Sequence, residues 1–468
     1  MSAATVPLGL RKGSCSVSSD GLNIFKLPPT LTDVEKITSV RKYPINRDLN
    51  HGAPFEFFIS GNDFDFIDLQ KISLYIKARV VDHRNRSLSK EESKKVAPVN
   101  NFFHSLFKKV EVRMGRETDA QISFSLPTYA YRSYLEELLS QSPDQAENFG
   151  HTIGWSPDLI DFDDIGGIVE EEDDKGVKIR VWKESENEGF RERQKLISES
   201  RTFEMMGNLN IDICCQSRML INQVNLRILL EKSSPEFCLM FAESDGPYKI
   251  YFEDLYLSVP YVTLSNTKFV EINKTLMTQP AVYPIRRVEV SDSIIHPNFK
   301  TVRFDNLFSN TQELPMRLVC GIVSNDRFSG NSHLNPFYFY HHNVKTLSLK
   351  IDGVCIGGNP YEMNFDQDLS MQPFHDLWSR LGFDTKCSAL DLNYNQFLEG
   401  STLYAFDLTP GLTAGTDLLH LAKRGNFLLE ITFEEVPTSS LNLIVYAEFQ
   451  SFIEVDYNRS LYISWYDG

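Results

Sequence analysis

Three histidines lie close together in the second half of the chain, at His333, His341 and His342. Imidazole nitrogens are common zinc ligands, so a cluster of this kind could bind a metal ion. Adjacent residues on a strand point to opposite faces, however, and His341 and His342 are adjacent. We therefore expect these side chains to pack within the protein or at an interface, and we predict no metal site.

An acidic stretch in the first half contains Asp161, Asp163 and Asp164, followed by the carboxylates from Glu170 to Asp174. Carboxylate oxygens are the ligands that Ca²⁺ prefers, but the EF-hand spacing, with Gly at position six and Glu at position twelve, is absent. Weak cation binding at the surface is the alternative that this stretch leaves open.

Paired carboxylates could also catalyse glycoside hydrolysis, and the segment GNDFDFIDL carries Asp63, Asp65 and Asp68. A glycosidase pair is defined by its distance across a cleft, which a sequence cannot give. The chain contains no nucleophile elbow, no P-loop and no Rossmann fingerprint. We therefore predict no catalytic, cofactor-binding or metal-binding residue, no cofactor and no enzymatic activity.

The chain has seven scattered cysteines, none in a CxxC motif or at zinc-site spacing from histidine, at Cys15, Cys214, Cys215, Cys238, Cys320, Cys355 and Cys387. An odd number of dispersed cysteines is typical of reduced thiols in an intracellular chain. Cys214 and Cys215 fall in a segment expected to be a buried strand, which favours a structural role. The N-terminus has no signal-peptide core, and no apolar run reaches the ~18 residues needed to span a bilayer.

The overall charge indicates how the chain would interact with nucleic acid. Sixty-three acidic residues against 47 basic ones give a formal net charge of −16. A DNA-binding protein neutralises phosphates with a cluster of lysines and arginines, and no such cluster is visible here. We therefore expect no direct, sequence-specific binding to nucleic acid.

These residues must be positioned by a fold, and length and composition indicate its class. A chain of 468 residues is long enough for two domains of about 200 residues each. Aromatic residues make up 12% of the chain, with 33 Phe and 19 Tyr, and they favour β-structure.

Apolar and polar residues alternate with the period of a strand in many segments. The clearest segments are 72–80, 109–115, 208–213, 288–290, 347–351 and 428–433. Apolar residues with helical spacing predict two helices, one near residues 127–141 and one near 373–382. The polar residues 1–45 predict an extended N-terminal arm, and the acidic run within residues 140–200 predicts a long exposed insertion.

The two halves of the chain repeat one pattern in the same order. VNNFFHSLFKKVEVRMG (99–115) matches NPFYFYHHNVKTLSLKIDG (335–353), and four further pairs of segments follow. The offset is about 235–240 residues before the acidic stretch and about 195–205 after it, so the first half carries an insertion. The pattern predicts duplication of one β-rich domain. A jelly roll or another β-sandwich topology could produce this pattern, because periodicity does not fix strand order.

Several segments together resemble one protein family. They include FEFFISGNDFDFIDLQKISLYIKARVV, VNNFFHSLF and YAYRSYLEELLSQ in the first half, and NPFYFYHHN, LYAFDLTP and LIVYAEFQSFIEVDYNRS in the second. The chain resembles the double jelly-roll major capsid proteins of Polinton/Maverick elements and adintoviruses, which are similar in plan to adenovirus hexon. The resemblance covers most of residues 50–460, but the N-terminal arm and the acidic insertion match nothing in it.

This resemblance implies an all-β fold of two tandem jelly-roll β-sandwiches with short helices in the loops. The expected domains are an arm at 1–45, a first jelly roll at 46–265 with the insertion at about 140–200, and a second at 266–468. It also implies a homotrimeric, pseudo-hexameric capsomer of an icosahedral virus-like shell. The expected partners are the chain itself and penton or minor capsid proteins, in a virion assembled inside the reducing host cell.

Three alternatives to this function remain open at this point. The chain could be a minor capsid or penton component, a cellular double β-sandwich that binds carbohydrate, or an enzyme with a cleft between two sandwiches. The aromatic run Phe337, Tyr338, Phe339 and Tyr340 is similarly open, because it could lie in a contact between subunits or in the domain's own core.

Overall fold

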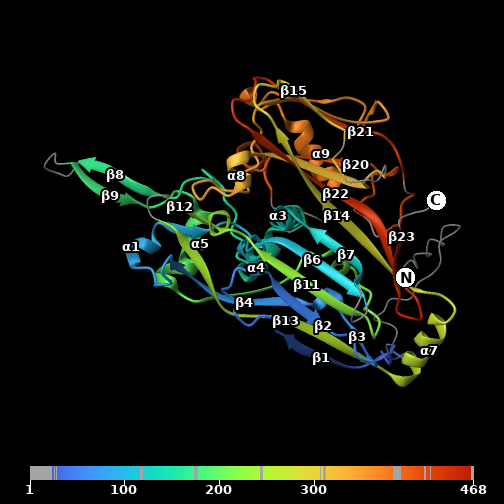
Figure 1. Cartoon of the computed structure of the whole chain (residues 1–468). Coiled ribbons are helices and arrows are strands. Elements are labelled where there is room, and N and C mark those ends of the chain that lie inside the picture. The colour runs from blue at the N-terminus through green and yellow to red at the C-terminus, as the bar shows by residue number, and fades with distance from the viewer. Residues whose placement is uncertain are drawn as a thin grey trace, which may run out of the picture.

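The computed structural model consists of two β-sandwiches in tandem (Figure 1). It describes residues 24–25, 27, 29–115, 120–140, 142–172, 178–242, 246–305, 307–308, 313–382, 392–415, 418–421 and 423–464. The first sandwich ends with β13 at Leu264, and the second begins with β14 at Ala281. Helix α7 (Asn266–Leu276) connects them.

The first sandwich has two antiparallel sheets. One has the order β1 (Val34–Lys42), β13 (Tyr248–Leu264), β4 (Ser73–Asp82), β10 (Phe203–Asn208), with β3 (Asp65–Ile67) also on β13. The other has the order β2 (Phe55–Ile59), β11 (Asn225–Lys232), β6 (Phe107–Gly115), β7 (Ala120–Leu126). Two small pairs join β5 (Val96–Pro98) to β12 (Leu239–Phe241), and β8 (Gly167–Glu172) to β9 (Lys178–Lys183).

The second sandwich is built in the same way. One sheet has the order β14 (Ala281–Ile295), β22 (Leu441–Val455), β16 (Arg317–Ser324), β20 (Leu403–Asp407), with β23 (Leu461–Ser464) on β22. The other has the order β15 (Thr301–Phe304), β21 (Phe427–Phe433), β17 (Val344–Ile351), β18 (Val354–Cys355), with β19 (Tyr361–Glu362) on β17.

Strand order identifies both sandwiches as jelly rolls. If the eight main strands of each sandwich are counted along the chain, one sheet reads 1-8-3-6 and the other 2-7-4-5, in both sandwiches. This is the eight-stranded, two-sheet jelly-roll arrangement. The all-β prediction of two tandem jelly rolls is therefore confirmed, and the choice that periodicity left open is decided by the hydrogen-bonded order.

Strand β4 shows how the sequence produces these layers. Leu74, Ile76 and Ala78 are fully buried between the sheets, while the residues between them, including Tyr75 and Lys77, face away from the core. Burying a Leu or Ile side chain contributes about 1.5–3 kcal/mol, so one such strand anchors its sheet strongly. A change such as Ile76→Asp would place an unpaired charge there and prevent this packing.

The predicted arm at 1–45 needs correction, because residues 34–42 form β1. This strand pairs with β13 along its whole length, from Val34 opposite Leu264 to Lys42 opposite Leu257. The sequence gives little sign of it, because almost every side chain of β1 is exposed and no apolar alternation exists. The backbone of β1 forms hydrogen bonds with the free edge of β13. These bonds stabilise the strand although its side chains are mostly polar.

The helices lie in the loops between strands. The two predicted helices are present as α3 (Tyr129–Ser140) and α9 (Met371–Leu381). Besides α7, the other described α-helices are α1 (Lys90–Ser93), α2 (Phe102–Ser105), α4 (Pro143–Ile153), α5 (Glu188–Ile197), α6 (Pro235–Cys238), α8 (Asn325–Ser329) and α10 (Tyr394–Glu399). None of the helices that the structure describes is long and apolar enough to cross a membrane.

The insertion at 140–200 is only partly the exposed excursion that its charge predicts. The β8–β9 hairpin does extend away from the first sandwich (Figure 1). Helices α4 and α5, in contrast, pack against β10 and β5 and bury Ile153, Phe190 and Ile197. These apolar residues are spaced between the charged runs, so the average charge of the stretch conceals them.

A second correction concerns the strand predicted at 208–213. Strand β10 already ends at Asn208, and a short 3-10 helix, η4 (Asp212–Cys215), follows. The alternation fails there because residues 211–214 are all buried in succession, with the carboxylate of Asp212 paired to the guanidinium of Arg132. On this turn Cys214 is buried, as predicted, whereas Cys215 is exposed, contrary to the prediction of a buried strand.

Candidate functional site

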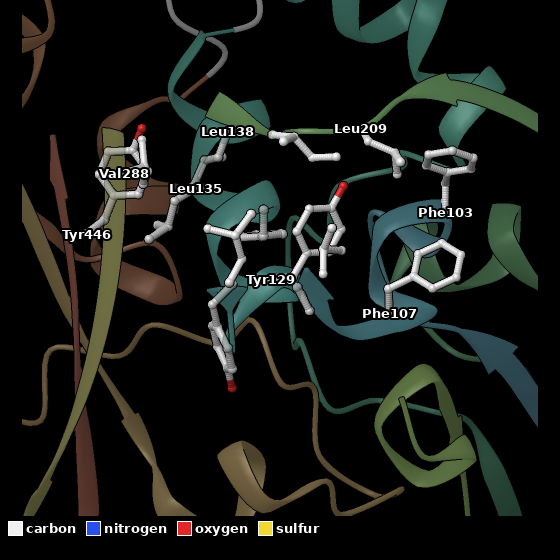
Figure 2. Close-up of a cluster of buried hydrophobic side chains, with 14 of the residues drawn as sticks. Phe103, Phe107, Tyr129, Leu135, Leu138, Leu209, Val288 and Tyr446 are labelled. Atoms are coloured by element: carbon white, nitrogen blue, oxygen red, sulfur yellow. The ribbon is translucent and has the colours of Figure 1, made fainter. Parts of the chain in front are cut away.

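The most unusual concentration of charge lies where the two sandwiches meet. Helix α3 and η4 of the first sandwich cover the outer face of the β14-β22-β16-β20 sheet. The Thr128 hydroxyl donates to the carbonyl of Val290, and the amide of Val288 donates to Asp212, both at 3.3 Å. In Figure 2, Leu135 points toward Val288 and Tyr446, while Tyr129 lies on the side of Phe103 and Phe107.

Arg132 is the centre of this contact. Its side chain is only 2% exposed, and its guanidinium lies 2.7 Å from Asp212 and 3.0 Å from Glu136. Burial by itself would lower the pKa of Arg132, but the carboxylates of Asp212 and Glu136 outweigh burial and raise it. The guanidinium is therefore always charged, and removing it would leave buried carboxylates without their counterion.

The network continues into the second sandwich through Tyr446. Its hydroxyl lies 3.3 Å from Glu136 and 3.1 Å from Glu448, and Glu448 in turn lies 2.5 Å from Arg317. Burial raises the pKa of Glu136, and burial together with Glu448 raises that of Tyr446. The ion pairs form within each sandwich, Arg132 with Asp212 and Glu136 in the first and Arg317 with Glu448 in the second, and the hydrogen bond between Tyr446 and Glu136 joins the two networks.

A cleft of about 780 Å³ opens beside this network. Among its lining residues are Arg132, Glu136, Arg317, Glu448 and Cys215, and no histidine is among the described residues that line it. Cys215 is exposed to solvent, although the protein atoms around its sulfur and the nearby carboxylates of Glu136 and Asp212 raise the pKa of its thiol. Buried ion-pair networks shift pKa values without catalysing reactions, and these groups are already paired with one another.

The insertion makes a second polar contact between the sandwiches. Asp158 pairs with Arg193 at 2.7 Å and also accepts from the side-chain amide of Asn335 at 2.7 Å. Asp163 receives both terminal nitrogens of Arg327, at 2.5 and 2.6 Å. Asp163, which the sequence alone could assign to a calcium site, therefore forms a bidentate ion pair with Arg327.

Of the other acids of the possible calcium loop, Asp164 has structural partners, and the side chains of residues 170–172 lie outside the description. Asp164 accepts from the backbone amides of Gly166 and Glu186 and so closes the base of the hairpin. Asp173 and Asp174 lie outside the described residues. Within the described ranges, no group of three or more His, Cys, Asp or Glu side chains is placed to hold a metal ion.

The histidines do not lie on a strand. They precede β17, in a turn where His342 and Asn343 have positive φ angles of 44° and 49°. The His341 ring stacks on Phe365 at 4.1 Å, and its Nδ1 accepts from the amide of Asn343. Burial lowers the pKa of both His341 and His342 to about 4, so both are neutral packing residues at physiological pH.

The aromatic run lies largely in the core between the sandwiches. Phe337 and Phe339 are fully buried, and Phe337 stacks on Tyr134 of α3 at 4.2 Å with parallel rings. The hydroxyl of Tyr131 donates to the carbonyl of Pro336. For Phe337 and Phe339 this favours the core over a contact between subunits, although the core is shared by two sandwiches.

Sequence reasoning did not find the network around Arg132. One signal was present, because Arg132 lies next to Tyr131 inside a helix whose other residues are mostly apolar or aromatic. A second was Glu448, a single acid within the apolar strand LNLIVYAEF. A charge inside an apolar element is rarely buried without a partner, so each of these two charges predicts an oppositely charged partner elsewhere in the chain.

No protein-family model matches this chain. It is 23% identical over 421 residues, covering 87% of this chain and 92% of the other, to "Uncharacterized protein F54H12.2" of Caenorhabditis elegans. A chain of the cryo-EM structure of the Sputnik virophage superposes with a TM-score of 0.60 at 11% identity, covering 100% of this chain and 95% of that one. The Faustovirus major capsid protein superposes with a TM-score of 0.56 at 9% identity, covering 92% and 91%.

These likenesses, together with the strand order, define the fold class. The chain has the double jelly-roll fold of viral capsid proteins, over essentially its whole length.

Proposed function

We propose that this chain is the major capsid protein of a virus or virus-like element. The observation that carries the proposal is the match along nearly the full length of both chains to the Faustovirus major capsid protein, through two sandwiches of identical strand order. A penton protein would normally need only one jelly roll, so the duplication favours the major subunit. The same comparison gives no support to an enzyme, and we propose no catalytic activity.

The assembly we propose is a homotrimer with a nearly hexagonal outline. Two similar lobes per chain give six lobes around a threefold axis, and closed cyclic symmetry buries matching surfaces without running on into fibres. Neighbouring trimers would then tile an icosahedral shell, with penton or minor capsid proteins as further partners. The virion is the proposed location, after assembly in the reducing interior of a host cell.

Light scattering on the purified chain tests this proposal directly. We expect one species of three times the chain mass of 53.7 kDa at micromolar concentration. Electron microscopy of assembled particles should show capsomers with six lobes. A stable monomer, or a twofold dimer with no threefold capsomer in any particle, would overturn the proposal.

The lineage we propose is that of Polinton/Maverick elements and adintoviruses, on the motifs VNNFFHSLF, NPFYFYHHN and FDLTP. Its test is genomic. The reading frames beside the gene should encode a packaging ATPase, a maturation protease and a protein-primed polymerase. A cellular gene neighbourhood without any of these would contradict the lineage.

The division of the chain is also part of the proposal: a first jelly roll at 46–265, extended at its N-terminal end to include β1, and a second at 266–468. We further propose that the β8–β9 hairpin points to the outside of the shell. With a net charge of −16, the chain should leave DNA condensation to another basic protein or to free cations. Tight, salt-sensitive binding of duplex DNA by the purified chain would contradict that last point.

A further inference from the structure

A row of large side chains crosses the solvent-facing side of the β1-β13-β4-β10 sheet. Tyr256 of β13 lies opposite Tyr75 of β4, and Tyr75 lies opposite Met206 of β10. Tyr43 directly follows β1 and places its ring 5.8 Å from that of Tyr256, while Tyr75 and Tyr256 stack at 4.6 Å. We call these four residues the tyrosine row.

The row has the composition of a protein contact site. Arg41 lies 4.6 Å above the ring of Tyr256, and Arg47 lies 4.7 Å above that of Tyr43. Tyr, Met and Arg are the residues enriched at the centres of protein interfaces. Met206 is 42% exposed and Tyr43 is 37% exposed, whereas Tyr256 is only 8% exposed, with Tyr43, Tyr75 and Arg41 packed against its ring. Every ring contact that the structure gives the row comes from the row itself or from these two arginines.

The second sandwich has a row at the same place in the fold. Val290, Tyr446, Val319 and Ala405 lie opposite one another across the β14-β22-β16-β20 sheet. There, Val319, Ala405 and Tyr446 are buried. Helix α3 and the segment between β10 and β11 cover this face, through the contacts of Thr128, Glu136 and Asp212 described above.

The duplication identifies the elements that would cover the tyrosine row. The counterpart of α3 in the second sandwich is α9, and the counterpart of the β10–β11 segment is residues 408–415 and 418–421, between β20 and β21. These elements expose apolar side chains: Met371 is 56% exposed and Leu421 is 82% exposed, and Leu412 is also exposed. Both elements belong to the second sandwich, whereas the row lies on the sheet of the first sandwich that contains β1 and β13 (Figure 1).

We infer that the tyrosine row of one chain receives α9 and the segment around Leu412 and Leu421 of a second copy of this chain. The contact would repeat between chains what α3 and η4 do within one chain. It is a head-to-tail contact, which closes into a ring when the rotation between lobes divides a full turn. The inference rests on the proposed capsid function and specifies the surface that the assembly would use.

A charge placed in the row tests the inference in the full chain. Met206→Lys, with Tyr75→Ala as a milder variant, should weaken association by roughly 30-fold or more, the effect of losing one interface hot spot. Met371→Lys, on the opposite surface, should have a similar effect. Val354→Lys is the matched control, since Val354 is 69% exposed at the far sheet. Trimers that persist in Met206→Lys and Met371→Lys would overturn the inference while leaving the capsid function intact.

A photo-cross-linker separates this contact from the proposed function. p-Benzoylphenylalanine placed at position 206 should cross-link to peptides carrying Met371, Leu412 or Leu421 of another chain, identified by mixing isotope-labelled and unlabelled protein. A trimer that cross-links elsewhere refutes the contact alone. Cross-links within one chain only, from a monomeric wild type, refute the contact and the capsid function together.

Discussion

The two jelly rolls share one strand order but differ in what their equivalent faces carry. The face of the second sandwich that α3 covers contains Tyr446, Glu448 and Arg317, with charges paired away from water. The equivalent face of the first sandwich carries the tyrosine row, with no buried charge. A face that is covered when the chain folds can hold desolvated ion pairs, because its partner is always present. A face that meets water before it meets a partner must be stable in both states, which tyrosine and arginine allow.

Removing the central cation should have the largest effect on this comparison. We expect Arg132→Met to lower the free energy of unfolding by about 3–5 kcal/mol, because Asp212 and Glu136 would be left buried without a counterion. The control is Arg113→Met, which breaks the more exposed pair with Glu111 and should cost no more than about 1 kcal/mol. Urea unfolding measures both. Equal costs would show that the contact between sandwiches does not depend on its charges.

Truncating one tyrosine on each face should lower the free energy of unfolding by different amounts. Tyr446→Ala opens a cavity between the sandwiches and should cost about 3–5 kcal/mol. Tyr75→Ala removes a half-exposed ring and should cost about 1 kcal/mol within the single chain. Both are best measured by thermal unfolding in the Met206→Lys background, so that association does not add to stability. A larger loss from Tyr75→Ala than from Tyr446→Ala would reverse the comparison.

A smaller difference between the two sandwiches is expected in the pH dependence of their stability. His104 is buried beside Tyr129, and burial lowers its pKa to about 3. Between pH 6.5 and about 3 the unfolded chain binds a proton that the folded chain refuses. Stability is therefore lost as the pH falls through this window, by up to about 1.4 kcal/mol per pH unit from this group.

His104→Gln should flatten that slope, whereas His83→Gln, at an exposed position, should leave it unchanged. Denaturant midpoints measured from pH 7 to pH 4 give the slopes. His341 and His342, whose pKa values burial lowers to about 4, should maintain part of the acid sensitivity in the second sandwich. An unchanged slope in His104→Gln would mean that the buried histidine of the first sandwich does not contribute to the loss of stability at low pH.

Shortening the hairpin should have the smallest effect. Replacing residues 168–182 with a short glycine-containing turn should change the free energy of unfolding by less than about 0.5 kcal/mol. A longer deletion, 168–197, also removes the buried Phe190 and Arg193 and should prevent soluble folding. If the short replacement alone abolishes folding, the hairpin is more than an excursion from the sandwich.

Much of this architecture could be predicted from the sequence, because the fold buries apolar side chains and their burial leaves a periodic pattern along each strand and helix. Strand β4 and helix α3 are visible in the spacing of their apolar residues. Strand β1 is not, because its stabilisation comes from the backbone of β13 and leaves no mark on its side chains. The contact between sandwiches is also hidden, since no period in the sequence tells which outer face another lobe will cover. The burial of Arg132 and Glu448 can be understood only once α3 is seen to pack on β22.

The hairpin base has a consequence for how this protein can diversify. Asp164 holds both feet of the excursion, accepting from the amides of Gly166 and Glu186, while the hydroxyl of Ser185 donates to its carbonyl. Because the two ends of the hairpin are joined through Asp164, the number of residues between them does not affect the packing of the sheets. Related chains can lengthen, shorten or replace this segment and keep one scaffold. A foreign peptide grafted between residues 172 and 178 should be displayed without redesign of the jelly roll.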